Sequence, residues 1–361
     1  MAAGDLDAFP LDIWKAAGEA GLLGVAVPAA YGGRGQDYLA VTAAAEALVG
    51  AGHNPGFCLS WMIHNVVARL VFWSRGNEEQ RARYLPGLAA GRITASISIS
   101  EPGVGAHPKH LQTRAVPRGG EYVLNGEKSY LTNGPFVDLY VVLAVTGARG
   151  ERKEFSALIV PRETPGVALT PPLALDSFRP SPHCGIRLTD CAVPAANMIG
   201  GPGTAYPAIA IAFRECEDVT LAGLVCGGMN RQLELLLAEL RRSGPVAKEV
   251  AAGLGRLRYL RDVLRLLAFT AASRLDAGTE ETERLSLLLS FRALAREFQE
   301  EIGRLAAPPL AAENGEYRSL TLDLLRAINL AGNVMMLKQS KHGAALLQAA
   351  ELIKVPNEKE I

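Results

Sequence analysis

The spacing of apolar residues along the chain predicts a helical segment, a β-rich segment and a second helical segment. Before residue 93, apolar residues recur every three or four positions, which is the spacing of an amphipathic helix. This helical part of the chain is followed by a charged stretch, 77–84, and by the pair Leu85-Pro86. The helices predicted here cover residues 11–23, 38–48 and 60–74.

Short runs typical of β-strands follow from residue 93 on. Residues 96–100 alternate between polar and apolar, as in a half-buried strand. We expect Asn125-Gly126 and Asn133-Gly134 to form tight turns on either side of a second strand, 128–132. The short intervals between the runs favour a compact barrel or sandwich. The other predicted strands are 113–116, 121–124, 140–145, 155–160, 167–169 and 185–188.

The helical pattern returns after Gly201-Pro202-Gly203 and lasts until a polar C-terminal tail. The helical stretches predicted here are 206–242, 246–277, 281–306 and 318–350. The chain therefore predicts an α+β fold of three domains. They are an N-terminal helical domain (1–93), a central β-barrel or sandwich domain (94–203) and a C-terminal four-helix bundle (204–361).

Composition narrows the range of partners. The 361 residues include 37 Lys plus Arg and 37 Asp plus Glu, so the net charge of zero indicates neither a nucleic acid nor an anionic surface as partner. Five dispersed cysteines without a CxxC pair are typical of reduced thiols, each most simply a small buried apolar residue. We find no signal-peptide pattern and no uncharged apolar run of about 18 residues. We expect a soluble cytoplasmic protein without a membrane anchor or a metal site.

The most informative stretch runs from residue 95 to residue 134. Glu101-Pro102-Gly103 ends the first strand, and Gly103 and Gly105 open a loop whose backbone can approach a ligand closely. Two strands with short hydroxyl side chains, an aromatic residue and a glycine loop can form a wall for a flat, hydrogen-bonding cofactor. The alternative interpretation is an ordinary antiparallel sheet with tight turns.

A set of motifs in a fixed order resembles the acyl-CoA dehydrogenase family. Ser100-Glu101-Pro102-Gly103-Val104-Gly105 is similar to the flavin loop of that family, and 125–134 (NGEKSYLTNG) is similar to its Asn-Gly-x-Lys-x-Trp-Ile-Thr-Asn-Gly strand. The resemblance extends through about residue 201 and is weaker beyond it. The other matching segments are Gly21–Gly24 with Pro28, Tyr31–Gly35, Tyr84-Leu85-Pro86 with Gly91, Phe155–Val160, Pro165-Gly166-Val167 and Val193-Pro194.

The resemblance implies FAD as the cofactor. Ile97, Ile99 and Ser100 would then lie along the isoalloxazine, Tyr130 would replace the usual Trp, and Thr132 would reach toward flavin N5. The full set of cofactor-binding residues that the resemblance implies is Ile97, Ile99, Ser100, Gly105, Ala106, Tyr130, Leu131 and Thr132. The loop departs from the family at its end, where Gly-Ser-Asp is replaced by Gly105-Ala106-His107; His107 either contacts a phosphate or is solvated.

The family's chemistry needs a carboxylate base in an apolar, water-poor pocket. Most members carry it as a Glu eight residues after an Arg-Asp pair, but eight residues after Asp323 this chain has Ala331-Gly332-Asn333. Isovaleryl-type and long-chain members instead place it on the first long C-terminal helix, where Glu217 stands here.

Helical spacing supports Glu217 independently, because its neighbours on the helix form a largely apolar face. These neighbours are Phe213, Thr220, Leu221 and Leu224. The alternative is a solvated surface carboxylate. Asp323, Glu215 and Asp218 are further acids to test, although none of them is predicted to be the base.

Other departures lie in the second half of the chain. Asp218 stands where the family has an Arg next to the base, and two adjacent acids raise each other's pKa. The Arg segment that reaches the FAD pyrophosphate of a neighbouring subunit survives only as Arg241-Arg242-Ser243-Gly244-Pro245. The glycine turn near the adenine is replaced by Ala306-Ala307-Pro308-Pro309, and proline lacks an N–H donor.

Our leading hypothesis is FAD-dependent oxidation of an acyl thioester to its α,β-unsaturated product, with Glu217 as base. The acyl group would be carried by CoA or by an acyl carrier protein, and the chain would form a homodimer or homotetramer. One alternative is a non-catalytic or FAD-poor partner subunit that keeps the fold for assembly. Another is a flavin oxidase or monooxygenase on the same scaffold. The sequence leaves the acyl chain and the electron acceptor open.

Overall fold

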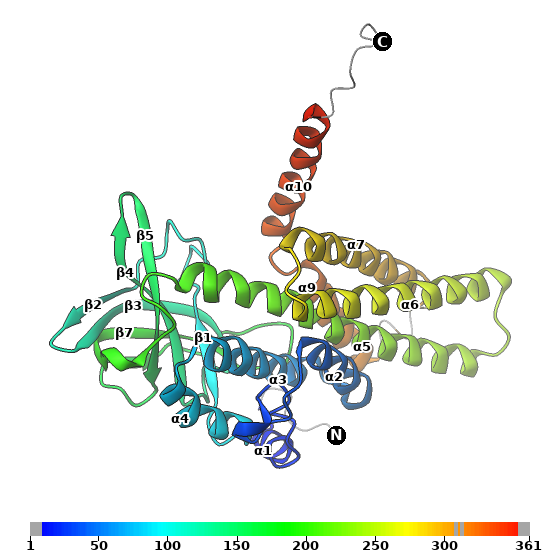
Figure 1. The fold of residues 1–361 in the computed structure, drawn as a ribbon. Coiled ribbons are helices and arrows are strands. Elements are labelled where there is room, and N and C mark those ends of the chain that lie inside the picture. The colour runs from blue at the N-terminus through cyan, green and yellow to red at the C-terminus, as the bar shows by residue number, and fades with distance from the viewer. Residues whose placement is uncertain (1–8, 307–309, 311–313, 353–361) are drawn as a thin grey trace, which may run out of the picture.

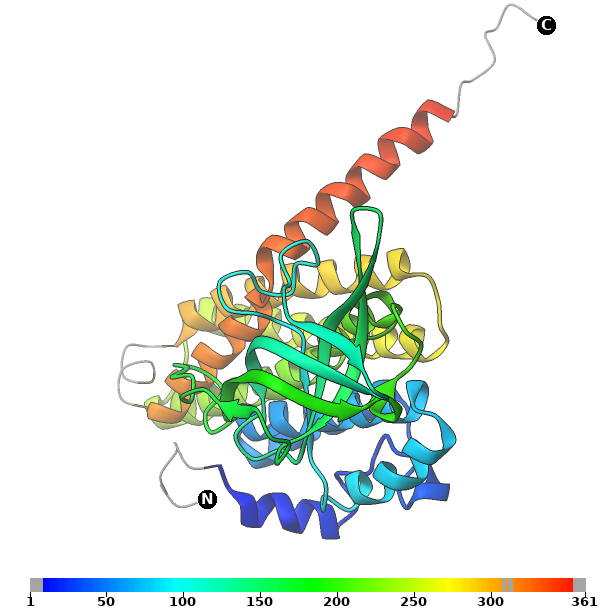
Figure 2. The ribbon, with the colours of Figure 1, turned by 90° about the vertical axis from the view of Figure 1, so that its left-hand side faces the viewer.

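A computed structural model describes residues 9–306, 310 and 314–352 of the chain. Figure 1 shows a twisted sheet at one end of the molecule and a group of long helices at the other, with the N-terminal helices running beneath both. The C-terminal helix projects away from the rest, which Figure 2 shows from a second side.

The N-terminal part is helical, as predicted. Polar caps fix where the helices begin: the side chain of Asp37 accepts from the N–H of Ala40, and Asn77 and Gln80 form a capping box. The charged stretch 77–84 proves to be the beginning of a helix. The elements are α1 (Leu11–Glu19), η1 (Ala29–Tyr31), α2 (Tyr38–Gly52), α3 (Pro55–Val67), the π-helical η2 (Ala68–Trp73) and α4 (Glu78–Ala89).

The middle of the chain forms one open sheet. Its order is β6-β7-β3-β2-β4-β5-β8, with β1 paired to β4 in parallel. The path begins with β6 and ends with β8, so the expected barrel is not closed. The strands are β1 (Ala95–Ser98), β2 (Arg114–Arg118), β3 (Glu121–Thr132), β4 (Leu139–Arg149), β5 (Arg152–Pro161), β6 (Val167–Leu169), β7 (His183–Pro194) and β8 (Met198–Ile199), with a 3₁₀ turn, η3 (Ala195–Asn197), before β8.

One of the two predicted Asn-Gly turns is wrong. Asn125-Gly126 lies within β3, where the register against β7 shifts, so 121–124 and 128–132 belong to one irregular strand. Gly126 has φ 147°, and a Cβ there would lie 2.5 Å from the hydroxyl of Thr113. Asn133-Gly134 does form the predicted turn, with Asn133 at φ 66°.

The two faces of the sheet have different cores. Ile97, Val141 and Phe155 belong to the large apolar cluster that also contains residues of the helices. Leu131 and Tyr140 belong to a separate cluster on the opposite face. Because successive side chains of a strand point to opposite faces, residues adjacent to the second set face the helices.

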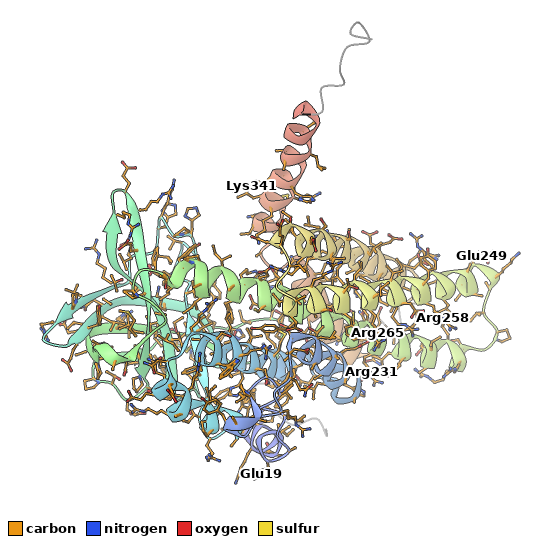
Figure 3. All side chains as sticks on the ribbon, in the orientation of Figure 1. Glu19, Arg231, Glu249, Arg258, Arg265 and Lys341 are labelled. Carbon is orange, nitrogen blue, oxygen red and sulfur yellow. The ribbon has the colours of Figure 1, made fainter. Side chains whose placement is uncertain are left out.

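Four helices pack together in the C-terminal part, as predicted: α5 (Ala212–Ser243), which follows the π-helical η4 (Tyr206–Ile211), α6 (Lys248–Asp276), α7 (Glu281–Leu305) and α9 (Gly315–Asn329). Figure 3 labels Arg231 and Arg265. The ion pairs of Arg231 with Glu316 and of Arg265 with Glu46 join α5 to α9 and α6 to α2.

The expected single helix over 318–350 is wrong. The chain breaks after α9 at Leu330 and Ala331, where Ala331 has the left-handed φ of 52°, and α10 (Gly332–Leu352) then leaves in a new direction. Within the part of the chain that the structure describes, two helical stretches are long and apolar enough to cross a membrane. The window in Pro55–Trp73 is 89% buried in the protein core, and the window in Gly315–Leu347, which spans this break, is 33% buried. All five cysteines are buried and unbridged.

Candidate cofactor and active site

A buried ion pair fixes the glycine loop that follows β1. The Nζ atom of Lys128 lies 2.9 Å from Oε1 of Glu101 and donates to the carbonyl of Ile99 at 3.0 Å. The same carboxylate accepts from the backbone N–H groups of Gln112 and Thr113, at 2.7 and 2.9 Å. Both ends of the 101–113 loop are therefore tied to β3.

Burial acts to raise the pKa of Glu101, but Lys128 and the two N–H donors outweigh it and hold the pKa below its usual value. Burial lowers the pKa of Lys128 to about 8, against the opposing attraction of Glu101. Lys128 and Glu101 together anchor the base of the loop. Their contact was not predicted from the sequence motifs.

Thr132, Ile97 and Ile99 lie on the side of the sheet that faces the helices. The two isoleucines belong to the cluster shared with the helices, and Thr132 follows Leu131, whose side chain is fully buried on the opposite face. Leu131 therefore offers a ligand only its backbone. The hydroxyl of Ser96 binds the carbonyl of Thr132 at 2.8 Å, which ties β1 to β3 directly.

Tyr130 is presented to solvent by a bulge of β3. The register shifts between Lys128 and Leu131, and Tyr130 sits there at φ 59° with 61% of its surface exposed. Such a backbone conformation is unfavourable for a bulky residue and tends to mark a functional position. Ser129, next to it, has a buried Oγ with no hydrogen-bond partner among the described residues. An exposed flat ring beside hydroxyl groups fits a planar, hydrogen-bonding group such as an isoalloxazine.

The loop beyond Ser100 is open. Gly103 and Gly105 have φ 74° and 60°, and a Cβ at either position would meet nothing within 4 Å. The carbonyl of Ala106 accepts from the hydroxyl of Tyr206 at 3.1 Å, which joins the loop to the helix leading into α5. His107 stacks at an angle on His110, with ring centroids 4.8 Å apart.

Glu217 lies in a cluster of charges on α5. Arg214 contacts both acids, at 3.0 Å from Glu217 Oε2 and 2.5 Å from Asp218 Oδ1. Arg292 of α7 lies 2.9 Å from the same oxygen of Asp218. Asp218 is thus held between two guanidinium groups with only 3% of its side chain exposed, whereas Glu217 keeps 17% exposed.

Burial raises the pKa of Glu217, and Asp218 adds to the rise, while Arg214 and Arg292 oppose it. The predicted apolar face around Glu217 is present, because Phe213, Thr220, Leu221 and Leu224 are all buried. The role of the two arginines was not predicted from the sequence. Arg214, three residues earlier on the same helix, and Arg292 from α7 offset the expected repulsion between Glu217 and Asp218.

The charge cluster reaches the junction where Ala331 stands. Arg292 donates to the carbonyl oxygens of Ile328 and Leu330, at 3.2 and 2.7 Å, so one guanidinium joins Asp218 to the end of α9. An open cavity of about 410 Å³ borders this junction; its lining residues are Asp176, Leu322, Leu325, Arg326, Asn329, Leu330 and Ala331.

Asp323 has a structural partner. Its Oδ1 accepts from the N–H of Phe178 at 2.5 Å, which joins α9 to the segment before β7. Burial raises the pKa of Asp323 to about 6. Two segments of the C-terminal part depart from the family's motifs. In the first of them, Arg241 and Arg242 are exposed at the end of α5. Residues 307–309 of the Ala306–Pro309 segment lie outside the described residues.

Comparison with known proteins assigns the chain to a family. Residues 2–92 match the N-terminal domain of the acyl-CoA dehydrogenases, and residues 96–191 match their middle domain. The chain belongs to the acyl-CoA dehydrogenase family.

Individual relatives agree with this assignment. A probable acyl-CoA dehydrogenase of Bacillus subtilis, YngJ, is 34% identical over 64% of this chain and 60% of its own length. The L-prolyl-[peptidyl-carrier protein] dehydrogenase of Pseudomonas fluorescens is 28% identical over 78% of this chain and 75% of its own. The solved FAD complex of PigA has the same fold, with a TM-score of 0.82 at 22% identity over 93% of this chain and 89% of that one. The chain thus spans less than two thirds of the length of YngJ.

Proposed function

We propose that this chain oxidises an acyl thioester to its α,β-unsaturated product with FAD as cofactor and Glu217 as base. Glu217 would take the proton from the α carbon while the hydride leaves the β carbon, so that two C–H bonds break and one C=C bond forms. Bound FAD supplies the acceptor of the hydride, and an external electron acceptor reoxidises it. The observation that carries the proposal is a part-buried carboxylate with a raised pKa, held by Arg214 together with Asp218. Asp218 is in turn joined by Arg292 to the carbonyl of Leu330, next to the Ala331 that replaces the usual glutamate.

The cofactor wall is the second part of the proposal. Ile97, Ile99 and Thr132 lie on the helix side of the sheet, and Tyr130 stands exposed on its bulge. Ser100, Gly105 and Ala106 would continue the wall along the loop that Glu101 and Lys128 fix. Purified protein that shows no flavin absorbance, and acquires none when FAD is added, would overturn this part.

The carrier of the acyl group is proposed from relatives. One similar protein is named for a prolyl group on a peptidyl carrier protein. We therefore favour an acyl carrier protein over CoA. Reduction of the bound flavin by a panel of matched carrier-linked and CoA-linked thioesters decides between the two.

One contact favours a second candidate function. Arg214 already holds Glu217 at 3.0 Å, as in a structural ion pair. A chain whose base is permanently engaged would act as a non-catalytic subunit in an assembly with an active homologue. It would leave the flavin oxidised with every thioester tested, and thioester oxidation would be seen only in the assembly with that homologue.

Assembly, location and domain division remain part of the proposal. Tyr259, Val263 and Leu266 form an exposed apolar stripe on α6, which supports a homodimer or homotetramer. Sedimentation of the purified chain tests this oligomeric state.

We also propose a cytoplasmic location, supported by five buried unbridged thiols. The proposed domains are residues 1–93, 94–203 and 204–361.

A further inference from the structure

His183 and Thr132 face each other at the end of the β3–β7 ladder. They are a directly opposed pair in the register of the two strands. The Nε2 atom of His183 lies 3.0 Å from the hydroxyl oxygen of Thr132, and its Nδ1 atom lies 3.0 Å from the carbonyl oxygen of Ser181. The imidazole is buried, with 8% of its surface exposed. The ring therefore bridges the carbonyl of Ser181 and the hydroxyl of Thr132, which the family resemblance directs toward the flavin.

The carbonyl of Ser181 determines which nitrogen carries the hydrogen. A carbonyl oxygen only accepts, so Nδ1 of His183 must be the N–H donor. Burial lowers the pKa of His183, so the ring is neutral near pH 7 and its Nε2 is a bare acceptor. The hydroxyl of Thr132 then has to donate its single hydrogen to His183. Only the lone pairs of the Thr132 hydroxyl oxygen then remain available to a ligand.

Helix α3 holds this arrangement in place. The hydroxyl of Ser181 lies 2.9 Å from that of Ser60, and the side chain of Asn133 donates to the carbonyl of Ser60 at 3.0 Å. Ser60 is fully buried on α3. The hydrogen-bonded groups in this chain, on Thr132, Ser181, Ser60 and Asn133, are all uncharged.

We propose that His183 is a positioning residue, which makes the Thr132 hydroxyl present lone pairs and no hydrogen to the hydride-accepting nitrogen of the flavin. The inference rests on the proposed function, which places the flavin against Thr132. With FAD bound, the lone pairs of Thr132 would accept from the N–H of the reduced flavin and would repel the lone pair that the same nitrogen carries in the oxidised flavin. His183 thus favours hydride uptake by stabilising the reduced cofactor relative to the oxidised one.

The reduction potential of bound FAD tests this directly. In His183→Leu the Thr132 hydroxyl is released and donates to the oxidised cofactor. We expect the equilibrium between reduced and oxidised flavin to shift about tenfold toward the oxidised form, which is ~30 mV for a two-electron couple. His183→Gln keeps an amide oxygen that accepts from Thr132, so its equilibrium should stay within about twofold of the wild type.

A double-mutant cycle supplies the control. Thr132→Val removes the hydroxyl at nearly constant shape, so adding His183→Leu to Thr132→Val should leave the potential unchanged. An unchanged potential in His183→Leu overturns the inference. The same shift in the presence and absence of the Thr132 hydroxyl also overturns it, because the effect would then come from packing.

Two measurements separate this inference from the proposed function. Flavin binding by the wild-type chain tests the proposed function alone. Nitrogen NMR of the full-length chain without flavin tests the tautomer: the inference requires the hydrogen of His183 on Nδ1, and a hydrogen on Nε2 overturns it even if FAD binds. The NMR measurement also decides the matter if His183→Leu fails to fold, because it uses the wild-type chain.

Discussion

Lys128 and Glu101 form an ion pair, 2.9 Å between Nζ and Oε1, in which the lysine side chain has no exposed surface. Removing one partner of such a pair leaves an uncompensated charge in the interior. Lys128→Met should therefore lower the free energy of unfolding by about 3–5 kcal/mol, as measured by urea denaturation. The double variant Lys128→Met with Glu101→Gln should recover part of this loss.

The exposed pair of Arg187 on β7 and Glu127 on β3 is the matched control, next to Lys128 on β3. It has a similar geometry, with 3.3 Å between the charged atoms, but the arginine side chain is 65% exposed. Arg187→Met should change the free energy of unfolding by less than about 1 kcal/mol. Equal losses for Arg187→Met and Lys128→Met would show that the buried pair does not anchor the loop.

Asp323 makes stability depend on pH. Its pKa is raised to about 6 in the folded protein by burial, from 3.8. A carboxyl with a raised folded pKa costs stability once the unfolded chain ionises, so the free energy of unfolding should fall by about 3 kcal/mol as pH rises from about 3 to 7. Below about pH 3 the carboxyl is protonated in both states and the effect disappears.

Asp323→Asn removes this titration while keeping an oxygen for the N–H of Phe178. Its stability relative to the wild type should rise between pH 4 and pH 7, as measured by thermal denaturation across that range. A constant difference between the two proteins over the range would contradict the assignment.

Alanine substitutions at two helical glycines should change the free energy of unfolding in opposite directions. A Cβ on Gly223 of α5 would lie 2.1 Å from the carbonyl oxygen of Thr42 on α2, whereas a Cβ on Gly50 would meet nothing within 4 Å. Gly223→Ala should cost about 1–3 kcal/mol because the two helices must separate. Gly50→Ala should add about 0.5–1 kcal/mol by reducing the entropy of the unfolded chain. Calorimetry of both variants checks the close packing of α2 on α5.

The order of the elements was predictable from sequence because it depends on periodicity and on local end signals. The helical spacing before residue 93 and after residue 203 predicted helices that the structure contains. The break at Ala331 was missed, because nothing in its neighbours marks a residue that adopts φ 52°. The sequence also placed a turn at Asn125-Gly126, where pairing with β7 instead carries the strand through a bulge.

The candidate site was predictable only in part. Motif order located Glu217 and the stretch from Ile97 to Thr132. The contact between Arg292 and Asp218 was not predictable, because the two residues are 74 positions apart and meet only when α7 packs on α5. His183 was missed for the same reason: only the register of β7 against β3 brings it opposite Thr132.

The pH dependence of turnover should follow Glu217. Because burial raises its pKa, the carboxyl ionises at higher pH than an exposed glutamate, and the rate of flavin reduction should rise with pH until it is fully ionised. Arg214→Gln removes a cation that opposes this rise, so it should move the midpoint of the profile to higher pH. A midpoint that stays in place in Arg214→Gln would exclude Glu217 as the titrating group.

The rate at which an acyl thioester reduces the bound flavin in the absence of oxygen tests the role of Glu217 as base. The wild type should lose its flavin absorbance on mixing with substrate. Glu217→Gln should bind the same amount of FAD and lose the absorbance about 10²–10⁴ times more slowly, since a positioned general base contributes that much to proton abstraction. Equal rates in the two proteins would exclude Glu217 as the base, and no reduction of wild-type flavin by any acyl thioester would exclude the proposed function.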